Sequence, residues 1–348
     1  MRTNLSSQIS LNHVSPRYYK PENAVERSVL TRLEKIPTDI FETIEEGVRR
    51  IADEVAAKIQ ERQREGKFCT LAIGTGTSLR PLFTELVRRH KDEGLSFRNV
   101  VVFNLYEFYP LTEGNGSTFG QLNSLFLSQT DIDRQNVFTI DGSIPQNAIS
   151  EHCRLYEQRI QTFGGIDIVL MGIGREGNIG MNEPGSHASS PTRLILLDAT
   201  SRSEAARNWG VDNLPPCSIT MGVQTILSAR KIYLLTWGED KADIIQKAVE
   251  ENINDTLPAS FLQLHNNVNV CIDLAAASHL TRIQRPWLVT SCEWNDKLIR
   301  SAIVWLCTLL NKPILKLTNK DYNENGLSEL LALYGSAYNV NIKVFNDL

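Results

Sequence analysis

The stretch IDIVLMGIGREGNIGMNE, residues 166–183, decides how the rest of the chain is interpreted. Five of its first six residues are apolar, and the run Ile166–Met171 has the length and composition of a buried strand. Three glycines follow, at Gly172, Gly174 and Gly177, and then a polar loop that ends at Glu183. A buried strand followed by a glycine turn and polar side chains is typical of a ligand site at the carboxyl end of a parallel sheet.

The glycines match the spacing of the dinucleotide-binding fingerprint, and an acidic residue, Asp198, follows at about the expected distance. That fingerprint also requires a helix that opens at its third glycine. Here residues 178–192 include Gly180, Pro184, Gly185 and Pro191, which leave no room for a helix of useful length. The pattern therefore argues against NAD as the ligand of this loop.

The composition excludes several classes of protein. The chain has 348 residues, of which 42% are hydrophobic, and a net charge of -4 with the charges interspersed, so it carries no electrostatic footprint for nucleic acid. Its apolar runs are too short to span a membrane, and the N-terminus lacks the apolar core of a signal peptide. The six cysteines have neither a CxxC pair nor zinc-ligand spacing. We therefore expect a cytoplasmic protein with free thiols and no metal, nucleic acid or membrane partner.

Strand-like and helix-like segments alternate along the chain. Strands are expected at 68–73, 100–104, 166–171, 193–197, 231–236 and 268–272, and helices at 40–65, 79–90, 149–163, 201–209 and 241–249. This alternation predicts βαβ units, and hence an α/β fold of three layers with a doubly wound, mostly parallel, Rossmann-like sheet.

The pattern also suggests three parts of the chain. Residues 1–36 read as a polar N-terminal arm, residues 37–284 as the α/β domain, and residues 285–348 as an appended α/β segment. In that segment we expect a helix at 296–310 and strands at 314–317 and 341–345.

A second glycine turn, Gly74-Thr75-Gly76-Thr77-Ser78, lies between a predicted strand and a predicted helix. Backbone N–H groups and small hydroxyls at a helix N-terminus suit a phosphate monoester. A plain turn with Ser78 as the helix N-cap explains the same residues. Arg207 and Lys241 lie in or at the start of later helices, where each is either a solvated charge or a cation brought towards the same phosphate.

Two further kinds of candidate are weaker. Glu107 follows the second predicted strand, where a carboxylate would suit acid/base work, although a surface glutamate explains it as well. His187 and His265 have no partner at metal-ligand spacing, and we expect them to be loop or packing residues.

Together these segments resemble the glucosamine-6-phosphate deaminase family, whose fold is shared with ribose-5-phosphate isomerase and 6-phosphogluconolactonase. The resemblance runs from about Leu30 to Leu280, and it is carried by TGTS at 75–78, VVFNLYEFYPL at 101–111, GIGREGNIGMNEPGS at 172–186, PTRLILLDATSRSEAARNW at 191–209, ITMGVQTILSARKIYLLTWGEDKA at 219–242 and SFLQLH at 260–265. It implies conversion of glucosamine 6-phosphate to fructose 6-phosphate and ammonia, without a cofactor. It also implies phosphate-binding roles for Thr75, Gly76, Thr77, Ser78, Arg207 and Lys241.

The catalytic positions differ from the family pattern. The family's base lies in an Asn-x-Asp-Glu-Tyr segment, and here Tyr106 stands at the aspartate position with Glu107 beside it. The family's ring-opening loop reads Asp-Gly-His, followed by a Glu before Pro, and here it reads Glu176-Gly177-Asn178 with Glu183 kept. Asn178 cannot take up a proton near neutral pH, and a tyrosine, with a reference pKa near ~10, is a poor base there.

Three functions fit this combination. The first is an amino-sugar phosphate deaminase or isomerase that draws its acid/base groups from Glu107, Glu176 and Glu183. The second is a non-catalytic sugar-phosphate-binding regulator, and the third is a lactonase that acts on a phosphorylated sugar acid. Each has a small sugar phosphate as its partner, and the resemblance leaves a homo-oligomer open.

Overall fold

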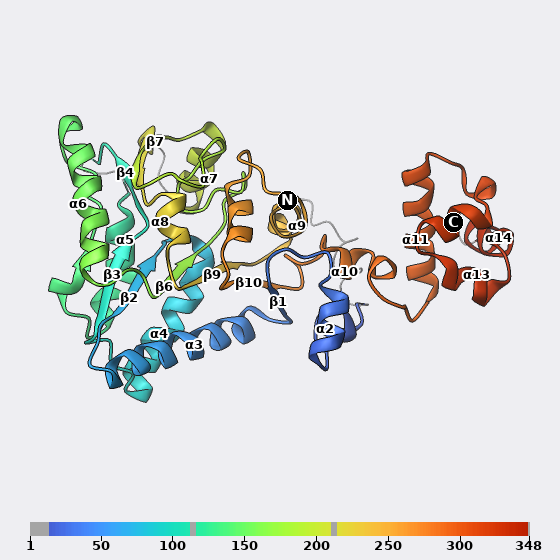
Figure 1. Ribbon diagram of the computed structural model, residues 1–348, viewed down its shortest axis with the longest axis horizontal. Coiled ribbons are helices and arrows are strands. Elements are labelled where there is room, and N and C mark those ends of the chain that lie inside the picture. The colour runs from blue at the N-terminus through green and yellow to red at the C-terminus, as the bar shows by residue number, and fades with distance from the viewer. Residues whose placement is uncertain (1–13, 112–115, 210–213, 347–348) are drawn as a thin grey trace. The chain divides into compact units, whose positions relative to one another are not determined.

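The computed structural model describes residues 14–111, 116–209 and 214–346 (Figure 1). The chain divides into two compact units. One unit is Glu34–Ser278, and the other joins the residues up to Leu33 with those from His279 onward. Among the described residues, no helix is both long enough and apolar enough to cross a membrane.

The unit Glu34–Ser278 is built on a sheet whose seven described strands are all paired in parallel, in the order β1-β10-β9-β6-β2-β3-β5. These strands are β1 Thr38–Phe41, β2 Cys69–Ile73, β3 Val100–Asn104, β5 Val137–Phe138, β6 Ile168–Met171, β9 Lys231–Thr236 and β10 Val268–Asp273. Every residue of β2, β3 and β6 is buried, because a parallel sheet is covered on both faces and its strands read as continuous apolar runs. The predicted parallel α/β fold is confirmed.

Helices flank both faces of this sheet, and α3 and α4 lie side by side on one of them (Figure 1). The helices of the unit are α3 Ile44–Arg64, α4 Arg80–Glu93, α5 Thr118–Leu125, α6 Ile149–Thr162, α7 Ala199–Trp209, α8 Val223–Leu227 and α9 Ala242–Glu250. Helix α3 buries Val48, Ile51, Val55 and Ile59, which recur at helical spacing.

The predicted helix at 40–65 was wrong at its start, because residues 38–41 form β1 on the edge of the sheet beside β10. Helix α3 begins only after Thr43, whose side chain accepts a hydrogen bond from the backbone N–H of Glu46.

A second, antiparallel sheet has the described strands β4 Tyr106–Tyr109, β8 Cys217–Thr220 and β7 Arg193–Leu196, in that order. We predicted residues 193–197 as a strand of the parallel series, and the structure places them in this smaller sheet instead. Three residues of β7 are partly buried and Leu196 is exposed, as is usual for an edge strand of an antiparallel sheet.

The unit that contains the C-terminal segment is helical, with a core of its own that includes Ile303, Leu306, Tyr322, Leu330 and Val340. Its helices are α2 Ala24–Leu30, α10 Thr281–Gln284, α11 Asp296–Leu310, α12 Asn319–Glu324, α13 Ser328–Tyr334 and α14 Ala337–Asn346.

Two predictions for the C-terminal segment were wrong. Residues 314–316 form a 3-10 helix, and residues 341–345 lie in α14 rather than in a strand. Ala337, Val340 and Val344 are buried at helical spacing, which is the pattern of a helix rather than of a strand.

Candidate functional site

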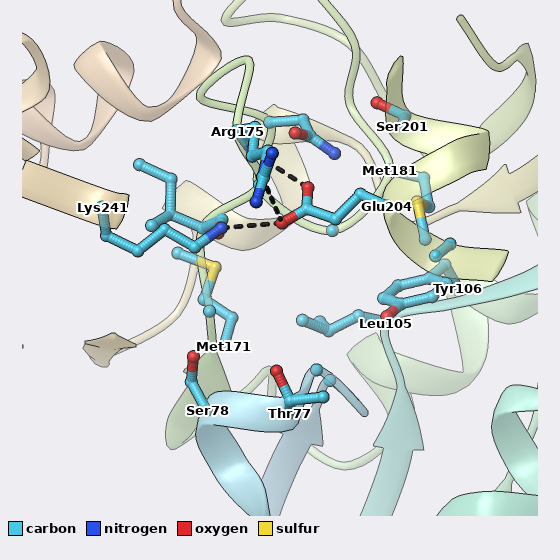
Figure 2. A pocket seen from close by; sticks show the side chains of 18 of the residues that line it. Thr77, Ser78, Leu105, Tyr106, Met171, Arg175, Met181, Ser201, Glu204 and Lys241 are labelled. Carbon is cyan, nitrogen blue, oxygen red and sulfur yellow. Dashed lines mark hydrogen bonds and ion pairs between the residues drawn. The ribbon is translucent and has the colours of Figure 1, made fainter. Parts of the chain in front are cut away.

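A pocket of about 300 Å³ opens where the central strands end. It is lined by the loops that follow β2, β3, β6 and β9, together with one face of α7 (Figure 2). Carboxyl ends of parallel strands are the usual place for a ligand in an open α/β sheet. The loop that was singled out from the sequence, after β6, contributes Gly172, Gly174 and Asn178 to its wall.

Most of the residues predicted to bind phosphate line this one pocket, namely Gly76, Thr77, Ser78, Arg207 and Lys241. Ser78 does not cap α4, because it lies inside the 3-10 helix Thr77–Leu79 that precedes that helix. The Ser78 carbonyl accepts a hydrogen bond of 2.9 Å from Trp237 Nε1, which ties the loop after β2 to the loop after β9. The predicted cradle is therefore assembled from three separate parts of the chain.

Thr75, the remaining predicted phosphate residue, lies just behind the pocket wall. Its side chain is buried, and its hydroxyl lies 3.4 Å from the hydroxyl of Tyr106 in a long hydrogen bond. Tyr106 itself lines the pocket and is only 8% exposed. Burial is the main cause that raises the pKa of the Tyr106 phenol, so this residue stays neutral near pH 7.

Asn178, at the position of the family's histidine, is buried in the pocket wall. Its Oδ1 atom has no hydrogen-bond partner among the described residues. A Cβ added to Gly174 would lie 1.8 Å from that Oδ1, so the tight fold of the loop requires glycine at this position. The amide can donate or accept a hydrogen bond to a ligand, but it cannot transfer a proton near neutral pH.

Glu183 is buried one layer behind the pocket. Its Oε2 accepts a hydrogen bond of 2.9 Å from the hydroxyl of Ser201, and Ser201 does line the pocket. Burial, together with the nearby Asp198, raises the pKa of the Glu183 carboxyl to about 7. Glu183 thus titrates near neutrality and is connected to the pocket through one hydroxyl.

The other two predicted carboxylates are not brought into the pocket. Glu107 is buried, and its two oxygens accept hydrogen bonds of 2.8 to 3.0 Å from Ser117 Oγ and from the backbone N–H groups of Phe108, Thr118 and Phe119. These donors belong mainly to the N-terminus of α5, so Glu107 caps that helix. Glu176 is exposed and does not line the pocket.

Sequence reasoning missed Glu204, a carboxylate in the wall of the pocket. Glu204 lines the pocket from α7 and lies 2.8 Å from Lys241 Nζ. A signal was present, because Ser201, Glu204 and Arg207 follow one another at three-residue spacing and so share a helical face. Arg175 and Asp240 also line the pocket and were not singled out.

The two lone histidines are placed as the sequence predicted. His187 is exposed, and His265 lies with Nε2 2.7 Å from the Ala229 carbonyl while its Nδ1 accepts a hydrogen bond from the Asn267 backbone. Across the described ranges, no three His, Cys, Asp or Glu side chains are grouped so that they could hold a metal ion.

Comparison with known proteins gives a consistent picture. The family model of glucosamine-6-phosphate isomerases and 6-phosphogluconolactonases matches residues 42–271. A glucosamine-6-phosphate deaminase-like protein of Bacteroides thetaiotaomicron is 67% identical over 350 residues, which is 100% of this chain and 53% of that protein. The chain thus spans about half the length of that relative. Glucosamine-6-phosphate deaminase 1 of Bacillus subtilis is 36% identical over 228 residues, covering 65% of this chain and 93% of the relative.

Solved structures agree with the sequence relatives. A monomeric glucosamine-6-phosphate deaminase matches with a TM-score of 0.66 and 35% identity, over 70% of this chain and 100% of that one. The 6-phosphogluconolactonase of Trypanosoma brucei matches with a TM-score of 0.58 and 18% identity, over 71% and 99% of the two chains, which shows a shared fold. The chain therefore belongs to the family of glucosamine-6-phosphate isomerases and 6-phosphogluconolactonases.

Proposed function

We propose that the pocket binds the phosphate ester of a hexose or an amino sugar. The observation that carries this proposal is the meeting of the 76–78 loop, Arg207 and Lys241 in one pocket. Backbone N–H groups and hydroxyls near a helix N-terminus, together with two cations, are the groups that bind phosphate monoesters. The names of the relatives, glucosamine-6-phosphate deaminases, supply the sugar class.

We further propose that the protein is a sugar-phosphate-binding regulator rather than a deaminase of ordinary turnover. Glu107, Glu176 and Glu183, which were the predicted acid/base groups, are absent from the pocket wall. Tyr106 and Asn178 do line the wall, and neither can act as a base near pH 7. Loss of a general base costs on the order of 10² to 10⁴ in rate, so two such losses leave little turnover.

One observation favours an enzyme as the second candidate. The pKa of Glu183 is raised to about 7, which is the value that suits a general acid or base near neutral pH. The Ser201 hydroxyl, which donates to Glu183, could carry a proton between that carboxyl and a sugar in the pocket. In this scheme the protein is an amino-sugar phosphate deaminase or isomerase with a relayed base.

Incubation of the purified protein with glucosamine 6-phosphate divides the two candidates, with ammonia and fructose 6-phosphate as the measured products. The regulator proposal expects binding, seen as thermal stabilisation, without product. Product at an ordinary rate of about 1 s⁻¹ or more, abolished by Glu183→Gln, would overturn it. Glu151→Gln, an exposed change on α6, serves as the control. Hydrolysis of 6-phosphogluconolactone in the same series checks the lactonase alternative.

A further inference from the structure

The ammonium group of Lys241, one of the two cations assigned to the phosphate, already has an anionic partner. Its Nζ donates a hydrogen bond of 2.8 Å to Glu204 Oε1, and a second of 3.1 Å to the Ile173 carbonyl. The pair is largely shielded, with 11% of the Lys241 side chain and 15% of the Glu204 side chain exposed. A charge-assisted bond in such a place is strong and is weakly screened by salt.

The Glu204 carboxylate also interacts with donors of the loop after β6. Glu204 Oε2 accepts a hydrogen bond of 3.1 Å from the backbone N–H of Arg175, and Oε1 lies 3.8 Å from Arg175 Nε. Figure 2 shows the carboxylate between the Arg175 and Lys241 side chains, inside the pocket. An ammonium group and a backbone N–H are the donors that an incoming phosphate would use.

We propose that Glu204 is a specificity-determining residue that competes with the phosphate of the ligand for Lys241. This inference rests on the proposed phosphate role of the pocket. When a phosphate monoester binds, it takes over Lys241, and the Glu204 carboxylate moves to the Arg175 guanidinium. Arg175 is suited to receive it, because its side chain is 43% exposed and already lies within ion-pair distance of Glu204.

The consequence is a pocket that binds phosphate esters less tightly than its cations would allow. An anionic ligand must displace one resident carboxylate and then lie near it, and like charges in a shielded site repel. A sugar without a phosphate meets no such competition. Glu204 therefore sets the phosphate affinity of the site. The lowered affinity makes a sugar-phosphate sensor respond only to high ligand concentrations.

Glu204→Gln tests the competition directly. Glutamine keeps the size of the side chain and can still accept from the Arg175 N–H, but it has no charge to hold Lys241. Titration calorimetry with glucosamine 6-phosphate and with inorganic phosphate should show binding at least about tenfold tighter than for the unchanged protein, which equals about 1.4 kcal/mol. Unchanged or weaker binding would overturn the proposal.

Glu239→Gln is the matched control, because Glu239 is an exposed acidic residue that precedes Lys241 by two positions and does not line the pocket. It removes the same charge near the site without touching Lys241, and we expect affinity to change by less than about twofold. A tenfold gain in this variant would show that net charge, rather than the Glu204 contact, controls the affinity.

A double-mutant cycle tests the proposed movement of the Glu204 carboxylate to Arg175. Arg175→Ala should weaken phosphate binding about tenfold in the unchanged protein, because Glu204 then has no second cation to pair with, and less than about twofold in the Glu204→Gln background. An equal loss of phosphate affinity in both backgrounds would mean that Arg175 contacts the phosphate itself. The proposed movement of the Glu204 carboxylate to Arg175 would then be contradicted.

The results also separate this inference from the proposed function. If Arg207→Ala weakens phosphate binding but Glu204→Gln leaves it unchanged, the competition by Glu204 is contradicted and the phosphate pocket stands. Absence of binding in both the unchanged protein and Glu204→Gln, with melting curves that show both folded, contradicts the phosphate pocket and the competition together.

Discussion

The hydroxyl of Ser201 donates a hydrogen bond to Oε2 of Glu183 at 2.9 Å, and this bond joins helix α7 to the loop after β6. Ser201 faces the pocket while Glu183 lies buried behind it. Burial raises the pKa of the Glu183 carboxyl from 4.5 to about 7, so the folded protein holds a proton there that the unfolded chain has lost.

This bound proton gives the stability of the protein a pH dependence. Between about pH 4.5 and pH 7 the folded state binds more protons at Glu183 than the unfolded state, so the contribution of this group to stability falls as pH rises. Glu183→Gln removes the titration, and at pH 8 it should be more stable relative to the unchanged protein than at pH 5, by on the order of 1–3 kcal/mol. Denaturant unfolding at both pH values measures the difference. Parallel pH profiles for the two proteins would contradict the raised pKa.

Glu107 should behave as a structural residue. Glu107→Gln replaces one of the two carboxylate oxygens with an amide N–H₂. That group then faces either the N–H donors of Phe108 and Thr118, which Oε1 accepts, or the N–H donor of Phe119, which Oε2 accepts, so at least one buried donor is left without an acceptor. We expect a loss of about 1–3 kcal/mol in the free energy of unfolding with little change in the affinity for glucosamine 6-phosphate. Calorimetric binding and denaturant unfolding on the same sample separate the two effects. If the variant keeps its stability but no longer binds the ligand, Glu107 is a residue of the binding site and its structural role is contradicted.

Gly222 marks a place where two backbone segments meet. A Cβ at this position would lie 2.0 Å from the Ser190 carbonyl oxygen and 2.2 Å from that of Pro191. Gly222→Ala should therefore force apart the loop before β7 and the start of α8, and we expect a loss of at least about 2 kcal/mol in the free energy of unfolding.

Gly120→Ala is the control for that change, because Gly120 lies within α5 and an added Cβ would meet only Ser117 at 3.5 Å. Alanine should stabilise this helix by up to about 1 kcal/mol. Equal melting temperatures for the two variants would contradict the close approach at Gly222.

The sequence predicted five of the seven described strands of the parallel sheet, because buried parallel strands are largely apolar runs, and it missed β1 and β5. Strands β3 and β9 begin and end where the pattern placed them. Strand β1 was missed because Ile40 also fits the apolar spacing of the helix that follows. The antiparallel sheet depends on pairing between β4 and β8, which lie more than a hundred residues apart, and local periodicity carries no such information.

The site was only partly predictable for a similar reason. The residues of the 76–78 loop, Arg207 and Lys241 were assigned through the family resemblance, since the sequence pattern alone left both the turn and the two cations open. They meet in one pocket because loops that follow parallel strands converge at one edge of a sheet. Strand alternation does predict that Glu107 points away from the direction of Tyr106, and only Tyr106 lines the pocket. The capping role of Glu107 could not be predicted, because the helix end that it caps, at Ser117 and Thr118, comes ten residues later. Glu204 was overlooked because an acidic residue on an amphipathic helix is ordinarily solvated.

Arg207→Ala tests most directly whether the pocket binds the phosphate of a sugar. Calorimetric titration with glucosamine 6-phosphate should show affinity at least about tenfold weaker in this variant, because hydrogen bonds to charged groups contribute about 1.5–3 kcal/mol. Binding of glucosamine should be unchanged, and Arg98→Ala, at a highly exposed position, should bind both ligands like the unchanged protein. Full affinity for glucosamine 6-phosphate in Arg207→Ala would contradict the phosphate pocket.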